Sequence, residues 1–185
     1  MFFKSVAALL LRITVVIYNS QAVPEREMAR AQAFAGRILQ QSGVDVVWRQ
    51  ATPSDINLGP AEIPLHILST HPARLGPRVG GYATMMPEGS YAGVSWPEVR
   101  RTAAELECDE SSVLGAVMTH ELGHVLLGTR DHSTYGVMVM RFGPRELLAA
   151  RRGELLFLKM EGQRIREEVA RRIRADAARR ATILR

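Results

Sequence analysis

The chain has 185 residues, of which 46% are hydrophobic and 23% are charged. That length and composition predict one globular domain with a sizeable core, and they exclude a fibrous, low-complexity or disordered chain. No apolar run is long enough to span a membrane as a helix, and the single cysteine, Cys108, excludes both an intramolecular disulfide and a cysteine-based zinc ribbon.

The positive charge is concentrated at the C-terminal end. Residues 141–185 carry 13 Lys and Arg against 6 Asp and Glu, whereas residues 1–140 carry 11 against 13. A basic arm of this kind can contact nucleic acid, anionic lipid or an acidic partner, but a solvated arginine-rich helix produces the same pattern. We therefore disfavour nucleic acid as a partner and leave contact of the arm with a membrane surface open.

The N-terminal stretch at residues 1–11, MFFKSVAALLL, has one lysine ahead of a short apolar run. This fits the remnant of a signal segment or a simple N-terminal extension. Cleavage at Ser20-Gln21-Ala22 would remove the strand that is predicted next. A location outside the cell or in the cell envelope and a location in the cytoplasm both stay open.

Residues 12–19 are rich in β-branched side chains and predict the first strand. Apolar residues at helical spacing then predict a helix from Pro24 to about Gln41. The segment VDVVW at 44–48 predicts a second strand, and the strand–helix–strand order favours a parallel pair. Residues 65–70 predict a third strand.

The segments 79–85 and 91–96, separated by MPEGS, predict a glycine-rich hairpin. Glycines within strands often mark places where another backbone comes close. A short helix is predicted at 97–108. It would lead directly into the segment that contains the candidate metal-binding and catalytic residues.

That segment contains the pattern HELGH, with His120, Glu121 and His124. Its apolar positions predict one helix from Ser111 to Leu127, with Ser111 or Ser112 as the N-cap. Two histidines one turn apart lie on the same helix face and can bind one zinc ion through nitrogen. Glu121, next to the first of them, is placed to take a proton from water at that ion.

Gly128 follows as a helix stop that tolerates a left-handed conformation, so that His132 can reach back to the metal. Three histidines leave a fourth position for water, which is the layout of a catalytic zinc site rather than a closed structural one. Zinc lowers the pKa of such a water to around 7, and Glu121 can pass its proton to a leaving amine. Hydrolysis of a peptide bond is therefore the expected reaction.

Two helices are predicted beyond this site. Pro144 suits the first position of a helix over residues 145–160. From Gln163 to the C-terminus, apolar residues recur every four positions and give a narrow stripe on an arginine-rich helix.

HELGH followed by a glycine, a third histidine and a downstream methionine resembles the metzincin clan of zinc metalloproteases, which includes archaemetzincin-like, matrixin-like and small bacterial metzincin-like proteins. The glycine-rich hairpin is similar to the clan's edge strand, which pairs with an extended peptide or protein substrate. By position, the resemblance implies the zinc ligands His120, His124 and His132, the base Glu121, and Met138 in a turn beneath the metal.

The spacing departs from the clan pattern HExxHxxGxxH, because the glycine and the third histidine are displaced by one and two residues. Some clan members have an aspartate in place of that histidine, which keeps Asp131 open as a ligand. Another zincin clan takes a glutamate from a later helix, which keeps Glu146 open. Tyr135 is a further candidate ligand or oxyanion donor. HELGHVLLG also resembles a zinc protease type that cleaves transcriptional repressors, but that type usually lacks a strand such as 12–19.

The predicted fold class is α+β: a metzincin-like zincin with a twisted mixed sheet, a crossover helix, an active-site helix and C-terminal helices. Residues 1–11 are predicted to be a signal remnant or an N-terminal extension, residues 12–143 the catalytic domain and residues 144–185 the basic helical arm. The predicted function is that of a zinc-dependent metallopeptidase with Zn²⁺ as cofactor. The alternative is a proteolytically inactive zinc-binding regulatory protein that acts through the basic arm.

Overall fold

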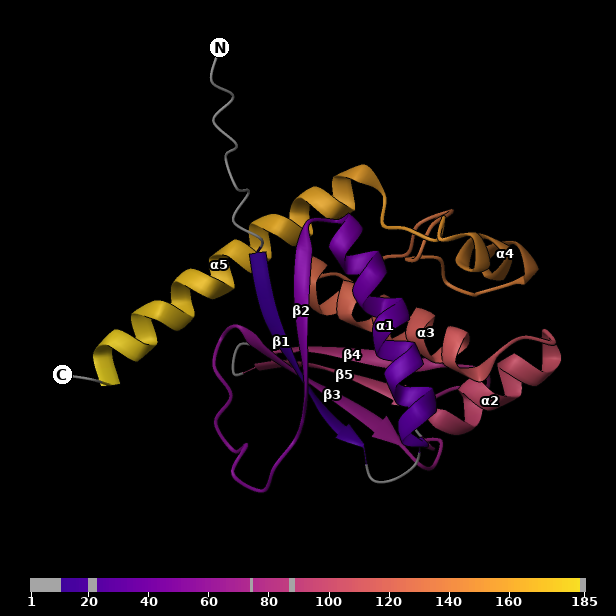
Figure 1. The fold of residues 1–185 in the computed structure, drawn as a ribbon, viewed down its shortest axis with the longest axis horizontal. Helices are drawn as coiled ribbons and strands as arrows, with labels where there is room; N and C mark the ends of the chain where they lie inside the picture. Colours follow the sequence, from indigo (N-terminus) through magenta and orange to yellow (C-terminus); the bar gives the residue numbers. More distant parts are fainter. Residues whose placement is uncertain (1–10, 20–22, 74, 87–88, 184–185) are drawn as a thin grey trace, which may run out of the picture.

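A computed structural model gives the architecture of residues 11–19, 23–73, 75–86 and 89–183 (Figure 1). The predicted extension at 1–11 therefore lies outside the described residues except for Leu11, and so does the candidate cleavage site at 20–22. None of the helices in the described ranges is long and apolar enough to cross a membrane.

Five strands form one mixed sheet. They are β1 (Leu11–Asn19), β2 (Val44–Gln50), β3 (Glu62–Leu68), β4 (Gly81–Met86) and β5 (Gly89–Ser95). Their order across the sheet is β2-β1-β3-β5-β4. The pairs β1–β2, β1–β3 and β3–β5 are parallel, whereas β4 pairs antiparallel with β5 and lies at the edge. The parallel pair of the first two strands and the glycine-rich hairpin are confirmed.

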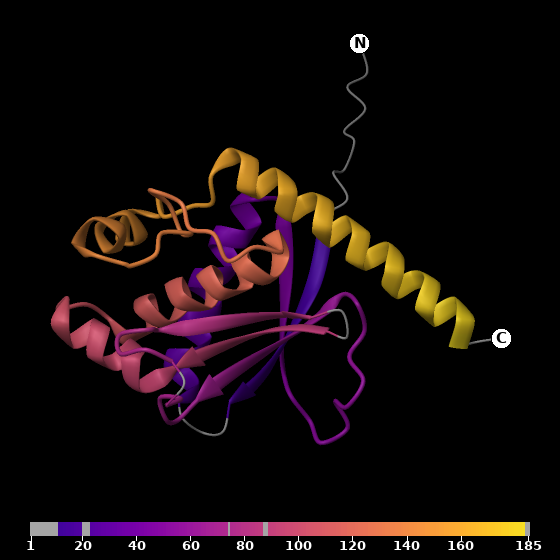
Figure 2. The ribbon, with the colours of Figure 1, turned by 180° about the vertical axis from the view of Figure 1, so that it is seen from behind.

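The helices are α1 (Glu25–Gln41), α2 (Trp96–Glu105), α3 (Glu110–Leu127), α4 (Pro144–Arg152) and α5 (Lys159–Ile183). α1 and α3 pack on each other, and α3 runs along β4 and β5 (Figures 1 and 2). Alternate side chains of β3, Ile63, Leu65 and Ile67, are buried in the core. This alternation is the period of a strand with one face packed against helices. The mixed α+β fold class is therefore confirmed at this level.

Some boundaries differ from the prediction. The helix predicted over 145–160 is wrong beyond Arg152, because Gly153 is left-handed (φ 73°) and ends α4. Residues 154–158 have no regular secondary structure, and α5 begins at Lys159. The third strand begins at Glu62 rather than at Leu65, since its first residues pair with β1.

α5 packs into the same core as the sheet. Ile165 and Val169 are fully buried. Arg164 donates a hydrogen bond to the last carbonyl of α3 (2.9 Å), and Arg166 donates one to the carbonyl of Ser42, just before β2 (3.0 Å). Part of the positive charge of the C-terminal arm therefore holds α5 on the rest of the chain.

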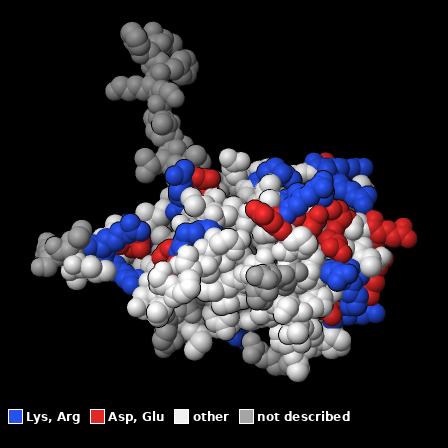
Figure 3. All heavy atoms as spheres, turned by 60° about the horizontal axis from the view of Figure 1, so that its bottom comes forward, with Lys and Arg blue, Asp and Glu red and all other residues white. Residues whose placement is uncertain are grey.

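Charged side chains gather at two ends of the face in Figure 3, one of them near the C-terminus, and the middle of this face is largely uncharged. The arginines of α5 are mixed with carboxylates. Glu168, for example, pairs with both Arg171 (2.7 Å) and Arg172 (2.8 Å). The excess of arginine on this helix is therefore partly neutralised on the helix itself.

Candidate metal centre

At both ends of α3, backbone groups form hydrogen bonds with neighbouring residues. Asp109 is the N-cap, and its carboxylate accepts a hydrogen bond from the backbone N–H of Ser112 (3.1 Å). The predicted N-cap at Ser111 or Ser112 is therefore wrong by two or three residues. Gly128 ends the helix in the left-handed conformation (φ 63°), as predicted, and its N–H donates to the carbonyl of His124 (2.9 Å).

Backbone carbonyls fix the rings of the two helix histidines. Nδ1 of His120 lies 2.9 Å from the carbonyl oxygen of Val137, and Nδ1 of His124 lies 2.8 Å from that of Thr129. A carbonyl oxygen can only accept, so both Nδ1 atoms carry the hydrogen and donate it. Each Nε2 atom is left with a free lone pair. This tautomer, with its N–H held by a carbonyl, is the one that a metal-binding imidazole uses.

The two Nε2 atoms point at each other, 3.0 Å apart. Burial lowers the pKa of His120 to about 4 and also lowers the pKa of His124, so both rings are neutral at pH 7. Two lone pairs without a proton between them repel, and a cation between them removes that repulsion. Two nitrogens bound to one tetrahedral zinc ion at about 2.05 Å are about 3.3 Å apart, so the observed spacing fits such an ion.

His132 joins this pair from the loop after α3. Its ring stacks on that of His120, with centroids 5.2 Å apart, and meets that of His124 at a right angle, with centroids 5.0 Å apart. One ligand nitrogen from each of the three rings lies within 4.8 Å of the others. His132 is exposed whereas the other two are buried, so the cluster opens to solvent on its side. The three side chains could hold one metal ion.

The other candidate ligands do not belong to this cluster and make other contacts. The carboxylate of Asp131 accepts a hydrogen bond from the hydroxyl of Thr129 (2.7 Å), and that of Glu146 caps α4 by accepting from the N–H of Gly143 (2.9 Å). Tyr135 lines a separate cavity. Within the described ranges, the three histidines form the only group of His, Cys, Asp and Glu side chains close enough to share a metal ion.

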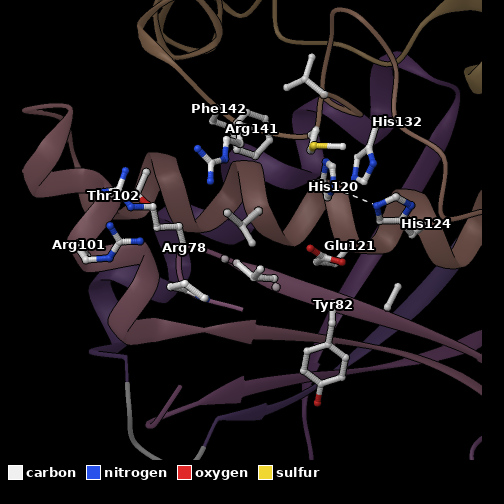
Figure 4. Close-up of a pocket in the computed structure, with 18 of the residues that line it drawn as sticks. Arg78, Tyr82, Arg101, Thr102, His120, Glu121, His124, His132, Arg141 and Phe142 are labelled. Carbon is white, nitrogen blue, oxygen red and sulfur yellow. Dashed lines mark hydrogen bonds between the residues drawn. The ribbon is translucent and has the colours of Figure 1, made fainter. Parts of the chain in front are cut away.

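Glu121 lies between α3 and the edge strand, on the side of the histidines that faces β4 (Figure 4). A Cβ atom on Gly81 would come within 2.7 Å of the Cγ and Oε1 atoms of Glu121, so the glycine lets β4 pass close to this carboxyl group. Burial raises the pKa of Glu121 to about 8. A cation held by the nearby histidines would favour the carboxylate and oppose this rise.

Met138 packs against α3 at Gly123. The Sδ atom of Met138 and the ring of Phe157 occupy the space that a side chain at Gly123 would need. Met138 is buried, whereas Met140 is exposed and lines the cleft described below. Met138 is therefore the methionine that lies against α3, the helix of the two histidines. It is also the methionine that the sequence favoured.

The segment that orients His120 is itself supported by residues 154–158. Val137, whose carbonyl accepts from His120, donates its own N–H to the carbonyl of Leu156 (3.0 Å). The neighbouring Gly136 is left-handed (φ 84°), and a Cβ atom there would lie 2.6 Å from the same carbonyl oxygen. The turn after the third histidine is therefore held by a chain segment that lies between α4 and α5.

The histidines and Glu121 line a cleft of about 740 Å³. Its walls are the start of β4 with the loop before it, the end of α2, and residues 139–142 (Figure 4). Four arginines of this cleft were not predicted, because they are far apart in the chain and form no motif; they are Arg78, Arg101, Arg130 and Arg141. The one local signal was the position of Arg78 close to the glycines of the hairpin.

No protein-family model matches the sequence, and no curated protein matches it significantly. Among solved structures, the chain is similar to a zinc-dependent peptidase from Methanocorpusculum labreanum, with a TM-score of 0.56 and 14% sequence identity over 82% of this chain and 99% of that chain. Similarity at this level of identity concerns the fold. The chain thus combines a fold found in a zinc-dependent peptidase with three histidines that could bind a metal ion.

Proposed function

We propose that the protein is a zinc-dependent peptidase of the metzincin type, with His120, His124 and His132 as zinc ligands and Glu121 as general base. The observation that carries this proposal is the convergence of the two neutral Nε2 atoms, 3.0 Å apart, with a third imidazole beside them. An all-imidazole donor set suits zinc, and three protein ligands leave room for a reactant. The fold shared with a zinc-dependent peptidase supports the same reading.

When bound, zinc supplies a Lewis acid that polarises the substrate carbonyl and makes the attacking water more acidic. The carboxylate of Glu121 accepts a proton from this water as the water oxygen bonds to the carbonyl carbon. Glu121 then donates that proton to the amide nitrogen as the C–N bond breaks. The products are a carboxylate and an amine, so water is the one co-reactant needed.

The edge strand β4 is the proposed binding surface for the substrate backbone. β4 pairs with β5 along one side, and Gly81, Tyr82 and Ala83 line the cleft. An extended peptide can add to such an edge through main-chain hydrogen bonds. This arrangement brings a peptide carbonyl to Glu121, because Gly81 keeps the strand close to that carboxyl group.

Metal analysis and peptide cleavage test the proposal together. Purified protein should contain about one zinc ion per chain, as three imidazole ligands around one ion require. It should cleave a mixed-peptide library, lose that activity with a chelator and regain it with added zinc. Zinc without cleavage of any peptide would favour the inactive zinc-binding alternative, and absence of metal binding would contradict both.

Replacing His132 by Ala should weaken zinc binding by at least about a hundredfold, because it removes one of three ligands. The dissociation constant can be measured by competition with a coloured chelator. Asp131→Ala is the matched control in the same loop, and it should change the constant by less than about fivefold. The opposite result, with Asp131→Ala weakening binding and His132→Ala leaving it unchanged, would make Asp131 the third ligand.

A further inference from the structure

Two arginines face the cleft from opposite walls. Arg78 lies in the loop that leads into β4, and Arg141 lies in the segment that follows Met140. Figure 4 shows Arg78 and Arg101 at one end of the cleft and the histidines at the other, with Arg141 on the wall across from Arg78. Side chains from two walls can contact one group that enters between them.

The charges of Arg78 and Arg141 are not compensated by the protein. Neither has an ion-pair partner in the described part of the chain. Arg101 differs, because it binds the carboxylates of Glu98 and Glu105, and the latter contact is 2.6 Å. Glu105, which also lines this end of the cleft, is therefore already engaged. The two free guanidinium groups leave this end of the cleft with an excess of positive charge.

The backbone of Arg78 supports a specific role for its side chain. It is left-handed (φ 70°), a conformation in which glycine is favoured and a residue with a Cβ atom is strained. Glycines follow at positions 80 and 81, so the hairpin has glycine where close packing requires it. An arginine in this conformation makes the folded protein less stable than a glycine would, but it supplies a guanidinium group.

The distance between Arg78 and the reacting carbonyl group has an upper bound. Gly81 contacts Glu121, and Arg78 is three residues earlier, which corresponds to at most about 10 Å of extended chain. A peptide that pairs antiparallel with β4 runs toward Arg78, so the residues after its scissile bond approach the two arginines. At about 3.3 Å per residue, the first three of them come within reach.

We infer that Arg78 and Arg141 form a subsite for a carboxylate on the C-terminal side of the scissile bond, so that the peptidase selects substrates with acidity at the first three positions after that bond. This inference depends on the proposed peptidase function. The carboxylate belongs either to an Asp or Glu side chain or to the free C-terminus of a short peptide, since a guanidinium fork binds both in the same way.

Matched peptides test the subsite. In the first pair, one peptide has Glu at all three positions after the cleaved bond and the other has Gln there, and both peptides have blocked ends. The Glu peptide should have a kcat/KM about twentyfold above that of the Gln peptide. A second pair compares a free C-terminal carboxylate at these positions with its amide. Preference in the first pair identifies a side-chain carboxylate, and preference in the second identifies a terminal one. Equal rates in both pairs, or a preference before the bond, would overturn the inference.

Three variants test whether Arg78 and Arg141 cause the preference for acidic peptides. Arg78→Gly and Arg141→Ala should each reduce it by about fivefold, and the double variant should abolish it. Because Arg78→Gly suits the left-handed backbone, its stability to urea should equal or exceed that of wild type while selectivity falls, a combination that a merely structural arginine would not give. Arg174→Ala, an exposed arginine on α5 outside the cleft, is the control for net charge and should keep full selectivity.

Binding of the same peptides to zinc-loaded Glu121→Gln protein, measured by fluorescence anisotropy, separates failure of the subsite from failure of the peptidase function. Tighter binding of the Glu peptide that depends on both arginines supports the subsite even if no peptide is cleaved by wild type. Cleavage by wild type without any acidic preference leaves the peptidase function standing and removes the subsite.

Discussion

Glu121→Gln should lower the rate of peptide hydrolysis by at least about a hundredfold while leaving the zinc content unchanged. Glutamine has the shape of glutamate but cannot take a proton from water, and a general base contributes roughly 10²–10⁴ to a rate. Glu121 is not one of the three residues whose nitrogens cluster, so its loss should spare the metal. The measurements are kcat/KM on the best peptide and metal content by atomic absorption.

Glu105→Gln is the matched control, because it removes a second carboxylate of the same cleft at a position held by Arg101. It should change kcat/KM by less than about fivefold, as expected for an exposed pair. Wild-type activity in Glu121→Gln would show that another group takes the proton. Loss of zinc in that variant would show that Glu121 acts on the metal site instead.

The second large effect is on folding, at the contact between α1 and α3. A Cβ atom on Gly115 would lie 2.8 Å from the backbone carbonyl oxygen of Ala31 and from the ring of Phe34. Backbone cannot yield as the end of a side chain can, so Gly115→Ala forces the two helices apart. Overpacking of this kind costs about 1–3 kcal/mol, against the roughly 1 kcal/mol that alanine adds to helix stability, so the variant should lose up to about 2 kcal/mol. Urea unfolding measures the difference.

Gly162→Ala is the control for this prediction. Gly162 lies in α5 and is also buried, but a Cβ atom there would meet Ser42 Oγ at 3.5 Å, an ordinary contact. The helix should therefore gain about 0.5–1 kcal/mol. Changes of opposite sign in the free energy of unfolding at the two glycines would establish that the close approach of α1 decides the result, and not the presence of glycine in a helix as such. Stabilisation by Gly115→Ala would contradict the packing.

Local signals in the sequence predicted most of the elements that carry the site. The β-branched run of β1, the helical spacing of α1 and the glycine at the end of α3 all act through neighbours in the chain. The start of the third strand was misplaced because Glu62, Ile63 and Pro64 become strand by pairing with β1, and no local pattern reports such a partner. Similarly, helix-forming residues on both sides of Gly153 concealed the break that this left-handed glycine makes.

The candidate site was predictable where one helix supplies its residues. His120, Glu121 and His124 follow from their spacing on α3. The carbonyl groups of Val137 and Thr129, which set the tautomers of the two rings, could not be predicted because every residue has a carbonyl. The sequence also left several candidates open for the third position. That choice depends on the path of the loop after Gly128, which only a three-dimensional structure describes.

The burial of the last helix beside the first strand has a consequence for protein synthesis. β1 leaves the ribosome well before α5, which packs against it and contributes Ile165 and Val169 to the same core. A nascent chain therefore exposes apolar surface of β1 until α5 has emerged. Contacts between such distant parts of a chain also form slowly. Folding of this domain during translation should thus remain incomplete until α5 has emerged, and a chain released before Val169 is a natural target for chaperones and proteases.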